Sequence, residues 1–138
     1  MADGTTKTVR KLAHATSGNT QIVPGRRAFF NYRDLGVADA SNGEIKAQVM
    51  TSIKGLTEPT GWHYHKCESQ FVHMIKGWVD LEFETGEQIR LKAGESLYIP
   101  GGMRHNEFGT SEDLEILEIV VPANMGTVVC DPPPGAKS

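Results

Sequence analysis

The sequence reads GWHYHKCESQ from residue 61 to residue 70, and this stretch decides how the rest of the chain is interpreted. Its two histidines, His63 and His65, are separated by one residue. On an extended strand, residues two apart point to the same face, with Cα atoms about 7 Å apart. At that spacing two imidazoles can bind one metal ion at about 2.0–2.1 Å each. The stretch therefore predicts a strand that presents two metal ligands.

A second stretch supplies a third histidine. It reads GESLYIPGGMRH from residue 94 to residue 105 and ends in His105. If this histidine lies on a neighbouring strand, it can join the first two. One oxygen ligand would then complete a four-ligand protein set.

The first stretch resembles motif 1 of the cupin family. That motif is His-x-His, four residues, a carboxylate, six residues and a glycine. His63, His65 and Gly77 match it, and Gln70 stands where the family has a glutamate. The resemblance therefore implies Gln70 as the oxygen ligand, with Glu68 as the competing candidate.

The second stretch resembles motif 2 of the same family, which is glycine, five residues, proline, one residue, glycine, two residues and histidine. Gly94, Pro100, Gly102 and His105 fit this spacing without a gap, and Gly109 replaces the asparagine that ends the motif. The resemblance covers roughly residues 43–121. It implies an all-β fold, the double-stranded β-helix or jelly-roll barrel of cupins.

The pattern of residues supports many short strands. Strand candidates are 27–33, 45–53, 70–76, 78–84, 87–92, 95–99 and 114–121. Residues 78–84 alternate apolar with acidic side chains, which is typical of a strand with one buried face. A Thr-Gly turn at residues 85–86 then predicts a hairpin with residues 87–92. The only helix that the pattern favours is a short turn within residues 33–40.

The length of 138 residues predicts one domain. We expect a flexible N-terminal arm at residues 1–20, a cupin barrel at residues 21–125 and a proline-rich C-terminal tail at residues 126–138. The tail prediction rests on residues 131–138, whose three consecutive prolines cannot join a sheet ladder.

Charge and composition limit the partners. A net charge of −3 gives no basic footprint, so we expect no nucleic acid. We see no secretory signal and no apolar run of membrane-spanning length, which favours a cytoplasmic protein with no membrane partner. The two cysteines do not form a disulfide framework. The cupin resemblance adds the expectation of a homodimer.

Replacing glutamate by Gln70 changes the charge of the predicted site. Three imidazoles and an amide are neutral, so a divalent ion would keep a formal charge of +2 instead of +1. Its Lewis acidity should rise and its affinity for the protein should fall. The cofactor we expect is one divalent metal ion, and imidazole ligands suit zinc, iron, manganese or nickel.

The leading hypothesis is a metal-dependent enzyme that acts on a small organic molecule with dioxygenase-like chemistry, the common outcome that the resemblance implies for three-histidine sites. The alternatives are a redox-neutral cyclase, lyase or isomerase at zinc or manganese, and a non-catalytic small-ligand-binding cupin. Catalytic residues beyond the ligands are not identified, although Tyr98 could handle protons. Arg26 and Arg27 could anchor an anionic substrate.

Three further interpretations concern individual side chains. His73 lies on the strand face opposite to Gln70 and should point away from the metal. Met74, Phe83, Tyr98 and Met103 are candidates for pocket lining or core packing. The acidic residues of the stretch 112–118, Glu118 among them, are most simply a solvated face.

One variant tests the ligand set directly. We expect Gln70→Glu to tighten metal retention, because an anionic ligand restores the Coulomb attraction to the cation, and to shift or reduce activity. Elemental analysis of the native protein and the variant, purified side by side, is the measurement. Identical metal content and identical activity would exclude Gln70 as a ligand.

Overall fold

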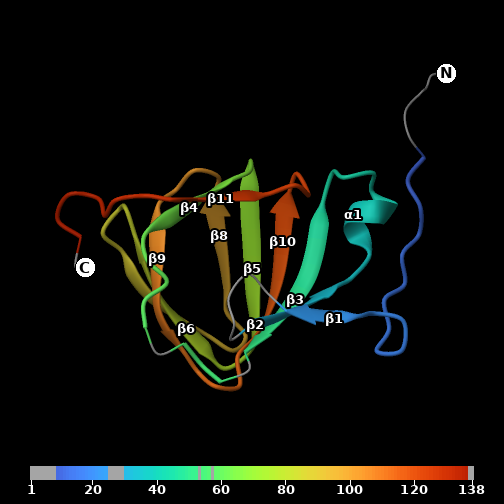
Figure 1. The fold of residues 1–138 in the computed structure, drawn as a ribbon, viewed down its shortest axis with the longest axis horizontal. Helices are drawn as coiled ribbons and strands as arrows, with labels where there is room; N and C mark the ends of the chain where they lie inside the picture. The colour runs from blue at the N-terminus through green and yellow to red at the C-terminus, as the bar shows by residue number, and fades with distance from the viewer. Residues whose placement is uncertain (1–8, 25–29, 53, 57, 137–138) are drawn as a thin grey trace.

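The computed structural model describes residues 9–24, 30–52, 54–56 and 58–136. It is a jelly-roll barrel of two facing antiparallel sheets, as Figure 1 shows, which confirms the predicted all-β fold. The strands are β1 (Ile22–Pro24), β2 (Phe30–Asp34), β3 (Lys46–Ser52), β4 (His63–Lys66), β5 (Ser69–Lys76), β6 (Trp78–Phe83), β7 (Gln88–Lys92), β8 (Ser96–Pro100), β9 (His105–Thr110), β10 (Glu115–Val121) and β11 (Gly126–Val129). One short helix, α1 (Val37–Ala40), lies between β2 and β3.

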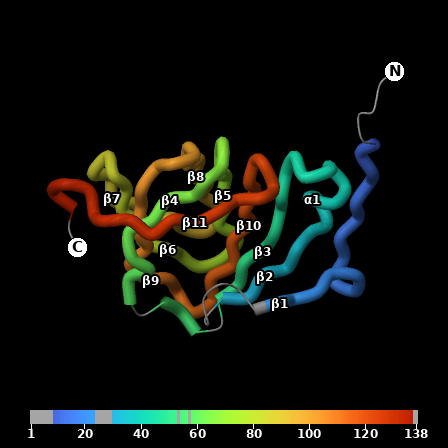
Figure 2. The backbone as a smooth tube through the Cα atoms, turned by 45° about the horizontal axis from the view of Figure 1, so that its top comes forward, coloured from blue at the N-terminus to red at the C-terminus, as the bar shows by residue number. Residues whose placement is uncertain are grey.

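The chain passes repeatedly from one sheet to the other. One sheet has the order β1-β2-β3-β10-β5-β8, and the other has the order β11-β4-β9-β6-β7. Figure 2 shows β11 and β4 running together across one end of the barrel. This winding brings β4 and β9, which carry the two motifs, side by side in one sheet and places β5 in the sheet opposite.

The predicted strands are confirmed, with ends shifted by a few residues. The hairpin of β6 and β7 pairs Val79 with Leu91 and Leu81 with Ile89, so the apolar halves of both alternating patterns share one face. Residues 27–29 and 53, at the ends of two predicted strands, lie outside the described residues. The predicted helical turn is present as α1, and it is shorter than the stretch from which it was predicted.

Two strands of the histidine cluster have no apolar pattern. β9 has the sequence HNEFGT and β4 has the sequence HYHK. Polar residues occupy their inward positions, so these strands lack the apolar alternation by which strands are recognised. Strand β9 could therefore not be recognised from the apolar pattern, whereas β4 was predicted from its two histidines.

The apolar core lies between the sheets, beside the histidines. It is formed by aliphatic and aromatic side chains from both layers, among them Phe30, Val72, Met74, Val79, Leu81, Phe83, Leu91, Ile99, Leu114 and Ile116. The predicted inward positions Val72 and Met74 are both buried. Phe83 and Met103, two of the residues predicted to line a pocket or pack in the core, belong to or contact this core.

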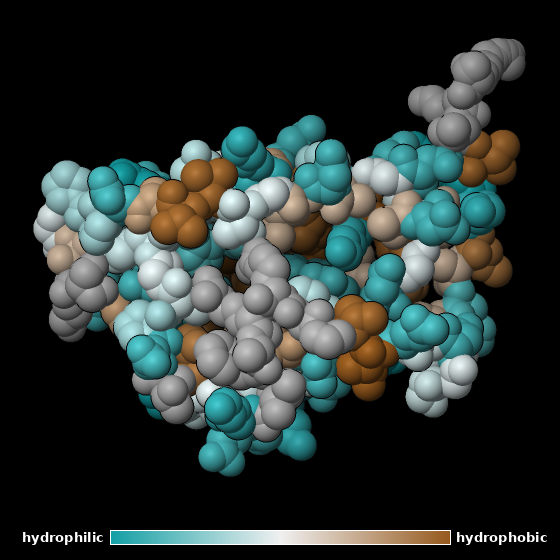
Figure 3. All heavy atoms as spheres, viewed as in Figure 1, coloured by the Kyte–Doolittle hydropathy of each residue, from teal (hydrophilic) through white to brown (hydrophobic). Residues whose placement is uncertain are grey.

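The described part of the N-terminal arm, residues 9–20, runs beside α1. The Lys11 N–H donates to the Ala40 carbonyl at 2.8 Å, and Asn42 Nδ2 donates to the Val9 carbonyl at 2.9 Å. The arm leaves Leu12 97% exposed. On the face drawn in Figure 3, apolar side chains form separate groups between hydrophilic ones, one of them along the edge where the arm lies.

The segment assigned to the C-terminal tail begins with a strand. β11 pairs with β4 from Gly126 opposite Lys66 to Val129 opposite His63. Residues 126–129 therefore belong to the sheet that carries the histidines, whereas the proline run that follows is outside it. The division into arm, barrel and tail stays a prediction. Among the described residues, the structure has no helix long and apolar enough to cross a membrane.

The turn of the second motif is hydrogen-bonded to the first motif. The Gly101 N–H donates to the Glu68 carbonyl and the Gly102 N–H donates to the His65 carbonyl, each at 3.0 Å. Gly102 has a φ of +81°, which favours glycine. A Cβ on Gly101 would lie 1.7 Å from the Cys67 carbonyl oxygen. Both glycines are therefore needed for the two ligand-bearing segments to meet.

We expect Gly101→Ala to destabilise the protein by about 1–3 kcal/mol, because the methyl group forces the turn away from the segment after β4. Urea unfolding of the metal-free protein measures this loss. Gly126→Ala is a matched control beside the same strand, since its Cβ would meet Lys66 at an ordinary 3.8 Å. Equal stability of the two variants would contradict the account of this turn.

Candidate metal centre

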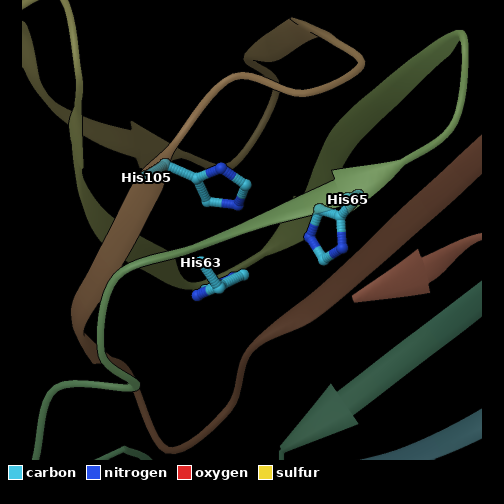
Figure 4. A group of neighbouring side chains, drawn as sticks. All are labelled: His63, His65 and His105. Atoms are coloured by element: carbon cyan, nitrogen blue, oxygen red, sulfur yellow. The ribbon is translucent and has the colours of Figure 1, made fainter. Parts of the chain in front are cut away.

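Three buried histidines meet inside the barrel (Figure 4). His63 and His65 project from the same face of β4, and His105 is the register partner of His63 on β9. The ring centroids are 5.2 Å apart for His63 and His65, 4.5 Å for His63 and His105, and 5.1 Å for His65 and His105. One nitrogen from each ring can be chosen so that all three lie within 4.8 Å of one another. Such a triangle of nitrogens can hold one metal ion.

Hydrogen bonds fix the orientation of the three rings. His63 Nδ1 lies 2.7 Å from the Gly61 carbonyl oxygen, and His105 Nδ1 lies 3.0 Å from the Met103 carbonyl oxygen. A carbonyl only accepts, so both Nδ1 atoms carry hydrogen and the lone pair is on Nε2. His65 Nδ1 lies 3.0 Å from the hydroxyl oxygen of Thr127 on β11. Partners of this kind orient histidine ligands in metal sites.

The backbone of Gly61, which orients His63, is held by a residue of the second motif. Asn106 follows His105 on β9, and its side chain is buried. Its Oδ1 accepts a hydrogen bond from the Gly61 N–H at 2.9 Å. Because the Gly61 carbonyl contacts His63, Asn106, which follows His105, helps to position His63.

Burial favours the neutral form of His105, which is the form that binds a metal. Loss of hydration lowers the pKa of His105, and the neighbouring His63 lowers it further. The carboxylate of Glu107 and the hydrogen bond to Met103 act in the opposite direction, and the lowering prevails. A neutral imidazole with a free lone pair is the form that binds a cation.

Gln70 provides the test of whether these residues fit a metal. It lies on the inward face of β5, in the sheet opposite the histidines, and is 5% exposed. Its Nε2 donates to Glu118, whereas its Oε1 is buried and has no hydrogen-bond partner among the described residues. A buried polar atom without a partner is costly unless a ligand satisfies it. Three imidazoles and this amide oxygen are together a suitable donor set for a divalent ion.

The alternative oxygen ligand is not favoured by its position. Glu68 is exposed in the short connection between β4 and β5 and is not part of the histidine group. His73 lies on the outer face of β5 with Nδ1 2.7 Å from Ser96 Oγ, as expected. Tyr98 is 61% exposed, so its assignment to pocket lining or core packing was wrong, and its role in proton handling stays a prediction. Arg26 and Arg27 lie outside the described residues.

The structure reveals two carboxylates that the sequence interpretation did not place in the site. Glu107 is on the same face of β9 as His105, and Glu118 is on the same face of β10 as the core residues Ile116 and Val120. The assignment of Glu118 to a solvated face was therefore wrong. The inward position of Glu118 could have been recognised because Glu118 lies midway between the apolar residues Ile116 and Val120 on one strand face. That of Glu107 could have been recognised because it lies two residues after His105.

Both carboxylates line the space beside the histidines. Two small cavities, each of about 60 Å³, share Glu107, Glu118 and Gln70 in their walls, and one reaches His105 while the other reaches His65. A larger, open groove of about 670 Å³ lies outside the barrel, between the arm and the strands β2 and β3. Tyr32 and Gln48 line both the groove and the cavity beside His65. The interior site therefore adjoins the surface along these two side chains.

Comparison with known protein families identifies the fold. The model of the cupin domain matches residues 49–120, more than half of the chain. The protein therefore belongs to the cupin family, as the two motifs indicated. No curated protein sequence matches this chain.

Solved structures with the same fold have low sequence identity to this chain. KdgF from Halomonas sp. is 16% identical with a TM-score of 0.66, over 81% of this chain and 94% of its own. The nucleoside dehydratase Pac13, from Streptomyces, is 13% identical with a TM-score of 0.62, over 88% of this chain and 94% of its own. Oxalate decarboxylase from Bacillus subtilis is 19% identical with a TM-score of 0.63, over 88% of this chain and 32% of its own.

We expect His105→Ala to lose most of the bound metal, because the remaining ligands no longer surround the ion. The metal content after dialysis against zinc, and the rise in Tm that zinc produces, are the measurements. His73→Ala is the control, since it removes an imidazole from the outer face. Equal zinc content in both variants would place the metal elsewhere.

Proposed function

We propose that this cupin is a metal-dependent enzyme that carries out redox-neutral elimination or isomerisation on a small oxygen-containing molecule inside the barrel. The observation that carries the proposal is the Glu107 carboxylate, which lies on the same strand face as His105 and borders the same cavity. Elimination and isomerisation need a group that moves protons beside an electrophilic centre. Two structural neighbours are a dehydratase and a decarboxylase by name. Loss of water or of carbon dioxide involves no net oxidation by dioxygen.

His63, His65, Gln70 and His105 would hold the divalent ion. When bound there, the ion would polarise a carbonyl or hydroxyl oxygen of the substrate. Glu107 would take a proton from the carbon alpha to the carbonyl carbon and deliver it to the hydroxyl group that leaves the beta carbon, while the electrons of the broken C–H bond form the new C=C bond. The products are an unsaturated compound and water, so no electrons are gained or lost. The apolar side chains around the cavity exclude bulk water from this transfer.

A dioxygenase-like activity is the second candidate. The observation that favours it is the set of three imidazoles, which suits iron as well as zinc or manganese. Manganese centres are described in the oxalate decarboxylase neighbour. The two candidates differ in what they require, because the dioxygenase needs a redox-active ion and dioxygen while the elimination needs neither.

The substrate would be a compact molecule that enters from the groove between the arm and the barrel. Tyr32 and Gln48 border both spaces, which supports this route. Homodimer formation and a cytoplasmic location stay predictions. The exposed apolar side chains of Val9 and Leu12 on the arm are consistent with pairing, and light scattering at several protein concentrations tests it.

Turnover by matched metal forms tests the proposed chemistry. The metal-free protein is loaded with Zn²⁺, Mn²⁺ or anaerobic Fe²⁺ and incubated with hydroxycarbonyl compounds, nucleosides, diketones and quercetin-like flavonols. We expect products that have lost water or isomerised in the Zn²⁺ or Mn²⁺ form, without oxygen uptake. Oxygen uptake restricted to the Fe²⁺ form would favour the dioxygenase, and binding without turnover in every form would favour a ligand-binding cupin.

The role of Glu107 is tested with whichever substrate is converted. Glu107→Gln should lower kcat by about 10²–10⁴-fold while the protein keeps its metal, because only the proton-transfer group is lost. Glu112→Gln, in the exposed turn before β10, is the control. Wild-type kcat in the Glu107 variant would remove this residue from the reaction.

A further inference from the structure

Glu118 contacts the one proposed ligand that is not a histidine. Its Oε2 accepts a hydrogen bond from Gln70 Nε2, and its Oε1 accepts one from Gln48 Nε2 at 2.7 Å. The three side chains come from adjacent strands of one sheet, β3, β10 and β5. Gln48 is the register partner of Glu118, and Gln70 is diagonal to it, beside Val120.

This arrangement determines which end of the Gln70 amide faces the cavity. A carboxylate only accepts hydrogen bonds, so the group of Gln70 that contacts Glu118 is the NH₂ group. The carbonyl end, Oε1, is then directed away from Glu118. Within the part of the chain that the structure describes, this buried oxygen has no hydrogen-bond partner, and Gln70 borders the cavities that reach His65 and His105.

We propose that Glu118 is a positioning residue of the metal centre: it holds the Gln70 amide with Oε1 toward the imidazoles, and it places beside that ligand the negative charge that the ligand set lacks. The inference rests on the proposed metal centre. It goes beyond the four ligands, because it assigns the missing charge to a residue that does not bind the ion. Gln48 secures the second oxygen of Glu118, so the carboxylate is held in one orientation.

Outer residues that orient ligands typically change metal affinity by about 10–100-fold when they are removed. A carboxylate that accepts from the amide NH₂ group also increases the electron density on the amide oxygen, which makes that oxygen a better ligand. The attraction between Glu118 and a divalent ion acts through a buried, weakly screened region, so it adds to the same effect.

Three variants separate these contributions. Glu118→Met removes both the acceptor and the charge. Glu118→Gln removes the charge but keeps one oxygen that can accept from Gln70. The double variant Q70E/E118Q exchanges the two groups, so that the carboxylate becomes a ligand and the amide at position 118 donates to it. Glu112→Gln is the control for the loss of a carboxylate outside the site.

The probe is Co²⁺, whose dissociation constant is measured by competition with a chelator and whose visible absorption reports the coordination geometry. We expect Glu118→Met to weaken Co²⁺ binding by about 10–100-fold, Glu118→Gln to weaken it less, and Q70E/E118Q to bind at least as tightly as the wild type. The absorption spectrum of Glu118→Met should change, because the amide loses its fixed orientation. The effect of Glu118→Gln should vanish or change sign in the Gln70→Glu background, whereas a residue needed only for packing would have the same effect in both backgrounds.

Two results would overturn the inference: wild-type Co²⁺ affinity and spectrum in Glu118→Met, or a Glu118→Gln change that weakens Co²⁺ binding by the same factor in the wild type and in the Gln70→Glu variant. Circular dichroism of the metal-free proteins establishes that each variant folds. If Glu118→Met does not fold, the comparison of Glu118→Gln with the double variant decides. Failure of the wild type to bind Co²⁺ would contradict the metal centre itself, which is a separate outcome.

Discussion

The convergence of three buried imidazoles at one point inside the barrel is the constraint on which the rest of the structure depends. His63 and His105 are partners across β4 and β9, and His65 follows on the same strand face. Burying three polar rings is unfavourable unless their nitrogens are satisfied. The Gly61 and Met103 carbonyls satisfy Nδ1 of His63 and His105, and the Thr127 hydroxyl contacts that of His65. The Nε2 atoms of His63 and His105 then carry the lone pairs that a cation can bind.

The two motifs are coupled by backbone hydrogen bonds as well as by their histidines. The turn at Gly101 and Gly102 donates to the carbonyls of Glu68 and His65, and Asn106 holds the N–H of Gly61. Each motif therefore fixes the position of the other. A ligand geometry built in this way needs no rigid loop, because the strands and their connecting turns carry it.

The opposite sheet contributes the polar part of the site that distinguishes this chain. Gln48, Glu118 and Gln70 form a connected row on adjacent strands, and Gln70 brings this row to the cavity. In the proposed metal centre, an amide ligand in place of glutamate therefore does not leave the site without negative charge. The Glu118 carboxylate would lie one residue further from the ion and would support Gln70 without binding the ion itself.

The fold and the histidine set could be predicted from the sequence, because the spacing of glycines and histidines matches the two cupin motifs and the apolar pattern marks most of the strands. Strand β9 could not, since His105, Asn106 and Glu107 conceal the apolar alternation by which a strand is recognised. Glu118 was assigned to a solvated face because an acidic residue is usually exposed. Its inward position depends on Gln48 and Gln70, which are 70 and 48 residues away in the chain and meet it only in the folded sheet.

The most direct test of the metal centre is a crystal structure of the zinc-loaded protein, with anomalous diffraction data recorded on both sides of the zinc absorption edge. The account predicts one strong anomalous peak between the imidazoles of His63, His65 and His105, with Gln70 Oε1 at about 2.0–2.2 Å and Glu118 outside the coordination shell. A peak bound directly by Glu118 with Gln70 turned away, or no zinc between the three imidazoles, would contradict it.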